Sequence, residues 1–390
     1  MRRIIGYNII IIVVLFGSME LTTRVISLIS GHGFTLALHE VDPFDRKIKD
    51  IYQWHPLVGF TFQPNSALSG SHPNQEKRAE IFIDQHGFLA TDKDLELEKK
   101  ANEIRIATIG GSTTASINLS YEQNWPGYLG NLIQKEFPDK KVRIINAGIP
   151  GFDTAQSIGN LALRVLPFRP DIVIIYHAYN DLKAIRGDLP FKSDYAHIHP
   201  KPYGFHKEPN WFIKFAGNSM LYVRTRNLVR DYKTKRLSDY KNLNNQNRFA
   251  TIPRLAERTF EEHVRTLVAI ARSAGASVIL SSFATLHDPY LDWHAPEKIM
   301  RVLSEFQKAN LGGLLQFTPG LTIPAIFEGI RRYNAVLYKV AVGENTGWVD
   351  NSKLVPHADQ YFVDRVHFSA AGAKLMAQNL VPHVNAILIE

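Results

Sequence analysis

The chain has 390 residues, 45% of them hydrophobic, so it can bury a core larger than a minimal domain needs and is neither disordered nor fibrous. It contains no cysteine, which excludes disulfides, a thiolate nucleophile and cysteine-ligated metal sites. The formal net charge of +8 is a modest excess that favours anionic neighbours such as phospholipid head groups, acidic glycans or nucleic acid.

The N-terminal segment has the composition of a membrane-spanning helix. Two arginines precede residues 4–19, which are almost wholly apolar, and the helical pattern can continue to Ile26. Glu20 and Arg24 stand four residues apart, so we expect them to pair where the helix meets the membrane interface. The preceding arginines orient the N-terminus toward the cytoplasm and place the rest of the chain outside it.

Residues 1–30 are predicted to be an uncleaved anchor, with a cleaved signal peptide as the alternative. Residues 17–20 are a poor match to the small residues that signal-peptide cleavage needs. A buried core helix is disfavoured because the run is apolar on all sides and lies at the terminus. We therefore expect a single-pass protein of the cell membrane whose catalytic domain is extracytoplasmic, or periplasmic in a Gram-negative cell.

Residues 31–103 are predicted to form an accessory, β-rich lead-in and a linker. Turn-forming residues punctuate this segment, and residues 81–88 have the pattern of a short hairpin. Residues 92–102 are dense in charge, which predicts a solvated helix or a linker ahead of the main domain.

From residue 104 to residue 390, short β-branched runs alternate with helical patterns. The predicted strands cover residues 104–109, 142–145, 171–176, 277–283 and 347–350. The predicted helices cover residues 125–137, 155–166, 259–274, 326–342 and 369–389. The third strand is apolar on both faces, as a central parallel strand would be. The alternation predicts an α/β fold with a doubly wound, flavodoxin-like parallel sheet of about five strands, flanked by helices, with its site at the carboxyl ends of the strands.

Two insertions interrupt this alternation, at residues 184–250 and 287–325. Insertions that follow strands of such a sheet lie beside the ligand crevice, so we expect them to form a lid or a wall of the substrate site. The first is rich in Pro, Tyr and His, and the second contains a Gly-Pro-rich turn region.

Basic residues and histidines stand out in the first insertion. Six Lys and Arg residues lie within residues 224–236. A solvated helix face and a grip on an acidic glycan or the bilayer surface explain them equally well, and nucleic acid is disfavoured. His197, His199 and His206 are close in sequence, but without carboxylate or cysteine spacing they favour a surface loop over a metal site.

Candidate catalytic residues follow the predicted strands. Ser112 comes after two glycines at the end of the first strand, which allows a sharp turn that lifts its hydroxyl off the sheet edge. A serine there is usually a helix cap. The segment is not a phosphate-binding loop, since no Lys follows, and not a G-x-S-x-G elbow, since Thr114 replaces the second glycine. Asp364 and His367 are three residues apart, so on a turn the carboxylate can reach the imidazole and fix its tautomer.

Four segments resemble the blocks of the SGNH hydrolases, also called GDSL-type lipases and esterases, and occur in that family's order. They are Gly110-Gly111-Ser112-Thr113, Asn146-Ala147-Gly148, Tyr179-Asn180-Asp181 and Asp364-Arg365-Val366-His367. The resemblance covers roughly residues 104–389 without the insertions. It implies that Ser112 is the nucleophile, that His367 is the base and that Asp364 orients it. It also implies oxyanion donors at Gly148 and Asn180, together with the Ser112 N–H.

Two positions depart from the family's pattern. Gly111 stands where the eponymous motif has Asp, a replacement shared by a membrane-anchored branch with Gly-Gly-Ser-Thr. Ala178 stands where the third block usually has Gly, and we expect it to tighten the loop that positions Asn180.

The resemblance implies a mechanism that needs no cofactor. The implied protein is a serine esterase that removes acyl groups, with acetyl favoured, from a cell-surface glycan or a lipid-linked substrate. One alternative is an O-acyltransferase that modifies an exported polysaccharide and receives its acyl group from a membrane-bound partner. Another is a membrane-tethered binding protein with an inactive site. No nucleic-acid partner is expected.

Overall fold

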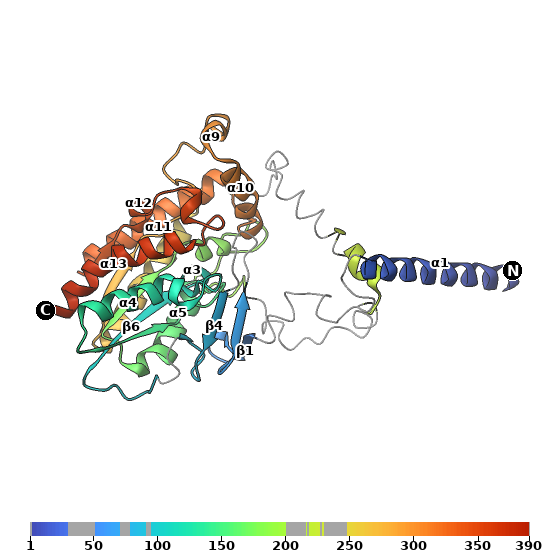
Figure 1. The fold of residues 1–390 in the computed structure, drawn as a ribbon. Helices are drawn as coiled ribbons and strands as arrows, with labels where there is room; N and C mark the ends of the chain where they lie inside the picture. Colours follow the sequence, from blue (N-terminus) through green and yellow to red (C-terminus); the bar gives the residue numbers. More distant parts are fainter. Residues whose placement is uncertain are drawn as a thin grey trace. The chain divides into compact units, whose positions relative to one another are not determined.

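The computed structural model describes residues 2–29, 51–70, 79–90, 95–199, 216, 218–226, 228–229 and 248–389. The chain divides into two compact units, which are considered separately. The smaller contains residues 1–50 and 204–237, and the larger contains residues 51–203 and 238–390. The larger unit holds the sheet and the helices that pack on it (Figure 1).

Within the described residues, eight strands form one sheet in the order β10-β9-β8-β6-β7-β5-β4-β3. Its parallel strands are β6 (Glu103–Gly110), β7 (Lys141–Asn146), β8 (Ile172–Tyr176), β9 (Ser277–Ser281) and β10 (Gly347–Val349). Every residue of β6 and β8 is buried, and for β8 this explains its continuous apolar sequence. Numbered along the chain, the parallel strands lie in the order 2-1-3-4-5, so the predicted flavodoxin-like sheet is confirmed.

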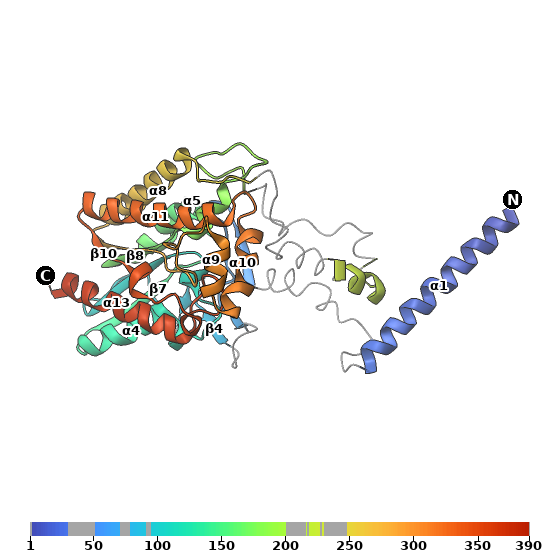
Figure 2. The ribbon, with the colours of Figure 1, turned by 90° about the horizontal axis from the view of Figure 1, so that it is seen from above.

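Helices cover both faces of this sheet. On one face α4 (Trp125–Glu136) packs with α13 (Ala370–Ile389), and on the other α8 (Arg254–Ser273) packs with α5 (Thr154–Asn160) and α11 (Ile323–Gly343), as Figure 2 shows. The start of α4 is capped by the side chain of Asn124 and the start of α11 by that of Thr322. The apolar faces of these helices and the central strands share one buried core.

The segment before β6 continues the sheet. Its strands are β1 (Tyr52–His55), β2 (Gly59–Phe62), β3 (Ala67–Gly70), β4 (Ala79–Ile83) and β5 (Leu89–Ala90). β3, β4 and β5 pair antiparallel, and β5 joins them to β7, while β1 and β2 form a separate hairpin. The expected boundary at residue 103 therefore does not separate compact units, because these strands bury apolar side chains against the rest of the larger unit.

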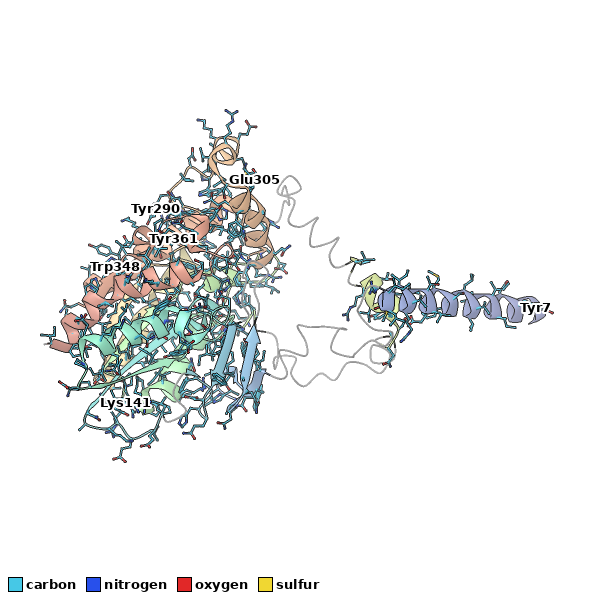
Figure 3. The ribbon with its side chains drawn as sticks, viewed as in Figure 1. Tyr7, Lys141, Tyr290, Glu305, Trp348 and Tyr361 are labelled. Carbon is cyan, nitrogen blue, oxygen red and sulfur yellow. The ribbon has the colours of Figure 1, made fainter. Side chains whose placement is uncertain are left out.

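Short elements complete the larger unit. They are α3 (Ser112–Ala115), η2 (Tyr121–Gln123), η3 (Leu161–Val165), η4 (Leu166–Phe168), η5 (Tyr179–Ala184), α9 (Pro296–Val302), α10 (Glu305–Phe317), α12 (Asn351–Leu354) and η8 (Asp359–Tyr361). The second insertion thus contains two helices, and Glu305, labelled in Figure 3, begins the longer one. The helix considered for residues 92–102 is not formed over residues 95–102, and residues 92–94 lie outside the described residues.

The smaller unit begins with α1 (Arg2–Ile29). Among the described residues, Gly6–Ile29 is the one helical stretch long and apolar enough to cross a membrane. Tyr7, labelled in Figure 3, lies near the start of α1, and most of the helix's described large apolar side chains are exposed. Membrane anchors and signal sequences both have this length and composition. The expected ion pair between Glu20 and Arg24 is formed at 2.8 Å.

Part of the first insertion packs against α1 within this smaller unit. The Glu20 carboxylate accepts hydrogen bonds from the N–H groups of Met220 (2.9 Å) and Leu221 (3.0 Å) and from the Ser219 hydroxyl (2.8 Å). The Arg24 guanidinium donates to the Asn218 carbonyl at 2.8 Å. Glu20 therefore caps the helical turn that starts at Met220, where an anion is favoured.

Candidate active site

Three side chains from distant parts of the chain meet at the carboxyl end of β6. Ser112 lies two residues after the end of that strand, and Asp364 and His367 lie in the turn before α13. His367 Nε2 is 2.8 Å from the Ser112 hydroxyl, and His367 Nδ1 is 2.7 Å from Asp364 Oδ2. With Nδ1–H donating to the carboxylate, Nε2 is free to accept the hydroxyl proton. The structure thus brings together the residues expected to act as nucleophile, base and orienting carboxylate.

The turn over residues 362–368 fixes the direction of the Asp364 carboxylate. The Val363 N–H donates to the His367 carbonyl at 2.9 Å, and the turn ends in an antiparallel bridge. Asp364 Oδ1 accepts the N–H groups of Val366 and His367, both at 2.9 Å. Because the backbone holds one carboxylate oxygen, the other is directed at the imidazole.

Ser112 is the first residue of α3, a single helical turn. A Cβ at Gly110 would lie 2.6 Å from the Tyr176 carbonyl oxygen, so only glycine fits where β6 runs into this turn. The Trp125 indole donates to the Thr113 carbonyl at 3.0 Å and so holds this turn in place. Among the described residues the Ser112 N–H has no acceptor, so it can donate to an oxyanion beside its own hydroxyl.

Asn180 approaches the nucleophile from η5. Its amide nitrogen donates to the Phe152 carbonyl at 2.6 Å. A Cβ at Gly111 would lie only 2.3 Å from this nitrogen, so the amide lies against the residue that precedes the nucleophile. An amide carries two N–H groups, and one remains after Phe152 has accepted the other. Ala178 has an extended φ of −177°, so its backbone conformation does not require glycine.

Gly148, the third expected oxyanion donor, has its N–H engaged in this structure. That N–H donates to Asn146 Oδ1 at 3.1 Å, and the Asn146 amide donates to the Thr114 carbonyl at 3.3 Å. A Cβ at Gly148 would lie 2.3 Å from the Ala115 nitrogen, so glycine is required where this loop packs against α3. The donor role of Gly148 stays a prediction.

The hairpin of β1 and β2 supports the loop that holds Asn180, a contribution that the sequence did not predict. Ile149 and Phe152 are buried in an apolar cluster with Val58 and Phe62. The Phe60 and Phe152 rings meet edge to face at a centroid distance of 5.1 Å. The hairpin therefore positions the carbonyl that accepts the Asn180 amide.

A network of buried polar groups links η5, the element that carries Asn180, to α5. Asp181 accepts the Thr154 N–H at 3.1 Å, and burial together with nearby Asp153 raises the pKa of the Asp181 carboxyl. Burial also lowers the pKa of His177 to about 4, so this imidazole is neutral at neutral pH. These buried groups hold the backbone of η5, and with it Asn180, in position.

The histidines of the first insertion bind separate partners. His197 Nε2 lies 2.7 Å from the Ala184 carbonyl, and His199 Nε2 lies 2.7 Å from Asp153 Oδ2. His206 lies outside the described residues. Across the part of the chain that the structure describes, no three His, Asp or Glu residues are grouped as metal ligands.

A cavity of about 390 Å³ lies elsewhere in the larger unit. It is lined by residues 185–191, Phe249 and Pro253. Neither the three meeting side chains nor the expected oxyanion donors line it, so the candidate site is assigned from hydrogen-bonding geometry and not from this cavity.

Comparison with known proteins matches the chain to one protein family and to several solved structures. The model of the GDSL-like lipase/acylhydrolase family matches residues 108–375, more than half of the chain. A variant of an acetyl xylan esterase from Geobacillus stearothermophilus is 15% identical with a TM-score of 0.43, over 74% of this chain and 97% of that one. A lipase/acylhydrolase from Enterococcus faecalis is 18% identical with a TM-score of 0.39, over 73% and 96%. None of the curated proteins matches the chain.

Proposed function

Because the chain belongs to the GDSL-like lipase/acylhydrolase family and is thereby an ester hydrolase, we propose that Ser112, His367 and Asp364 are its catalytic triad. The observation that carries this proposal is the distance of 2.8 Å between His367 Nε2 and the Ser112 hydroxyl. His367 takes the hydroxyl proton as Ser112 attacks the ester carbonyl, and Asp364 stabilises the imidazolium that forms. The C–O bond of the ester then breaks, and the imidazolium gives its proton to the departing alcohol. Water, activated by the imidazole that is now neutral again, hydrolyses the acyl-enzyme.

The proposed oxyanion hole is built from the Ser112 N–H and the second N–H of the Asn180 amide. Gly148 contributes a third donor in the proposal once its N–H leaves Asn146. Such donors stabilise the negative charge that develops on the carbonyl oxygen, and losing one costs about a hundredfold or more in rate.

The proposed substrate is an O-acetylated cell-surface glycan or a lipid-linked saccharide. A short acyl group is supported by the surroundings of the triad. Within the described residues, none of the exposed large apolar side chains lies in residues 110–118, 148–154, 179–184 or 362–369. A long acyl chain would need an extended apolar surface there.

Residues 1–30 are proposed to remain attached as a single-pass anchor, with the catalytic unit outside the cytoplasm. The contacts of Glu20 support retention, because signal-peptide cleavage on the C-terminal side of Glu20 would remove the acceptor of the Met220 and Leu221 N–H groups. The arginines at positions 2 and 3 support the orientation, since positive charge favours the cytoplasmic side.

The experiment measures acetate release from p-nitrophenyl acetate and from an O-acetylated polysaccharide by the detergent-solubilised full chain, with Ser112→Ala beside it. Release by the native chain alone supports the esterase. Equal inertness of both proteins would reject catalysis at this site and favour an inactive, membrane-tethered binding protein. Transfer to an added polysaccharide without net hydrolysis would instead favour an O-acyltransferase that is supplied by a membrane-bound acyl donor.

A further inference from the structure

Two cationic side chains contact the ring of Phe317 beside the candidate triad. The Arg365 guanidinium carbon lies 5.6 Å from the ring centroid, and the Lys183 ammonium nitrogen lies 5.0 Å from it. Arg365 directly follows Asp364 in the catalytic turn. Phe317 is the last residue of α10, so the second insertion contributes the aromatic ring that both cations contact.

The Arg365 side chain is held in place by aromatic residues. Its Nε donates to the Tyr179 hydroxyl at 3.0 Å. The Tyr179 ring stacks on Phe317 at a centroid distance of 4.7 Å and an interplanar angle of 10°. A Cβ at Gly313 would lie 2.8 Å from Arg365 Nη1, so glycine at that position leaves room for the guanidinium. The planar fork of Arg365 is therefore positioned before a ligand arrives.

Lys183 reaches the same ring from the oxyanion side of the site. It lies in η5, three residues after Asn180, and its ammonium donates to the Gly151 carbonyl at 3.0 Å. The next residue is Phe152, whose carbonyl accepts the Asn180 amide. Arg365 thus belongs to the turn that carries His367, and Lys183 belongs to η5, which carries Asn180.

Within the described residues, Arg365 and Lys183 donate their hydrogen bonds to neutral oxygens. Asp153 and Asp181, whose charges act on Lys183, hydrogen-bond other groups. Arg365 donates to a phenol and Lys183 to a backbone carbonyl. Asp364 accepts from His367, and Asp181 accepts from Thr154. A partly buried cation gains most from an ionised acceptor, because charge-assisted hydrogen bonds are stronger than those to neutral oxygens.

We propose that Arg365 and Lys183 form a subsite for a carboxylate on the acylated substrate, which makes that substrate an acidic glycan. This inference rests on the proposed esterase function and narrows its substrate class. A planar guanidinium binds a carboxylate through two parallel hydrogen bonds, and the lysine adds a compact positive charge. An acidic phospholipid is disfavoured, because the described segments around the triad lack the exposed large apolar side chains that its tails would cover.

The test compares two substrates of the detergent-solubilised full chain: an acetylated uronic-acid oligosaccharide and an acetylated neutral oligosaccharide of equal length. We expect kcat/KM to be at least about tenfold higher for the acidic substrate. Arg365→Gln and Lys183→Met each lower the acidic-to-neutral ratio about tenfold, mainly through KM, and Arg365→Lys restores part of it. The control Arg258→Gln, on an exposed side chain of α8, leaves the ratio unchanged.

The outcomes separate the subsite from the esterase itself. If Arg365 only braced the fold, its variant would lower kcat/KM for both substrates together and leave the ratio unchanged, which would overturn the subsite. Equal kcat/KM values for the two substrates in the native chain would also overturn the subsite. They would not contradict the proposed esterase function. Faster turnover of acetylated acidic-phospholipid vesicles than of either glycan would reject the acidic glycan. Hydrolysis of no ester by the native chain would reject the proposed function itself.

Discussion

The Asn180 amide nitrogen occupies the place where a side chain at position 111 would begin. A Cβ on Gly111 would lie 2.3 Å from that nitrogen, closer than Cβ atoms approach other atoms. The eponymous family motif has Asp at this position, and this chain has glycine. The absence of a side chain at Gly111 is therefore what lets the Asn180 amide lie against the nucleophile's turn.

Gly111→Ala should displace the Asn180 amide and lower kcat for p-nitrophenyl acetate about a hundredfold, the cost of one oxyanion donor. In an Asn180→Ala background the same change should cost much less, because the displaced group is already gone. Gly343→Ala is the control, since its Cβ would meet no atom nearer than 3.8 Å. Losses of equal size in both backgrounds would show that the two positions are not coupled.

Asp364→Asn should lower kcat about ten-thousandfold at neutral pH while preserving the fold. An asparagine keeps the size of the side chain but no longer holds His367 in the tautomer that accepts the Ser112 proton. Steady-state kinetics with p-nitrophenyl acetate checks this, with the exposed Asp292→Asn as the matched control. A loss smaller than about tenfold would contradict the orienting role of Asp364.

The parallel strands and the candidate triad were predictable because their signals are local. A strand that is buried on both faces reads as a continuous apolar run, and the three-residue spacing of Asp364 and His367 suits one turn. The added strands at the edge were not predicted as part of the sheet, since short alternating strands carry no signal for their distant partner. The helix α10 was missed because Gly312 and Gly313 weaken its local helix propensity.

The contacts around the site could not be predicted from sequence for a different reason. The meeting of Phe60 with Phe152 and of Arg365 with Phe317 depends on how separate segments pack, and no local pattern encodes it. The engagement of the Gly148 N–H by Asn146 likewise depends on a loop conformation that the block Asn146-Ala147-Gly148 does not reveal.

Two buried histidines should make the fold sensitive to acid. Burial lowers the pKa of His177 and of His287 from 6.5 to about 4. As the pH falls below 6.5, each of these histidines is protonated in the unfolded chain but stays neutral in the folded protein. Each histidine therefore lowers the free energy of unfolding by roughly 3 kcal/mol by pH 4. The raised pKa of Asp181 opposes this trend, because the folded protein keeps that proton as the pH rises.

A variant isolates the contribution of one histidine. His287→Gln should make the free energy of unfolding depend less steeply on pH between about 4 and 6.5, as measured by urea denaturation. The exposed His294→Gln is the matched control. If the free energy of unfolding depends on pH equally steeply in His287→Gln and in the native chain, then His287 has the same pKa in the folded and the unfolded state.

Glu20→Ala should loosen the segment that α1 holds in the smaller unit. Three hydrogen bonds to one carboxylate are lost, so trypsin should cleave after Arg224 in membranes roughly tenfold faster. Thr22→Ala is the control, since among the described residues the Thr22 hydroxyl donates to the Ser18 carbonyl of α1 itself. Cleavage at the native rate would argue against the cap at Met220 and against the contact as support for a retained anchor.

Reaction with a fluorophosphonate, followed by peptide mass spectrometry, tests most directly whether Ser112 is the nucleophile. The reagent should form one adduct, on Ser112, at a rate that falls sharply in His367→Ala and is unchanged in Ser273→Ala, a variant of an exposed serine at the end of α8. An adduct on a different serine, or ester hydrolysis by the folded chain with Ser112 unlabelled, would contradict the proposed triad.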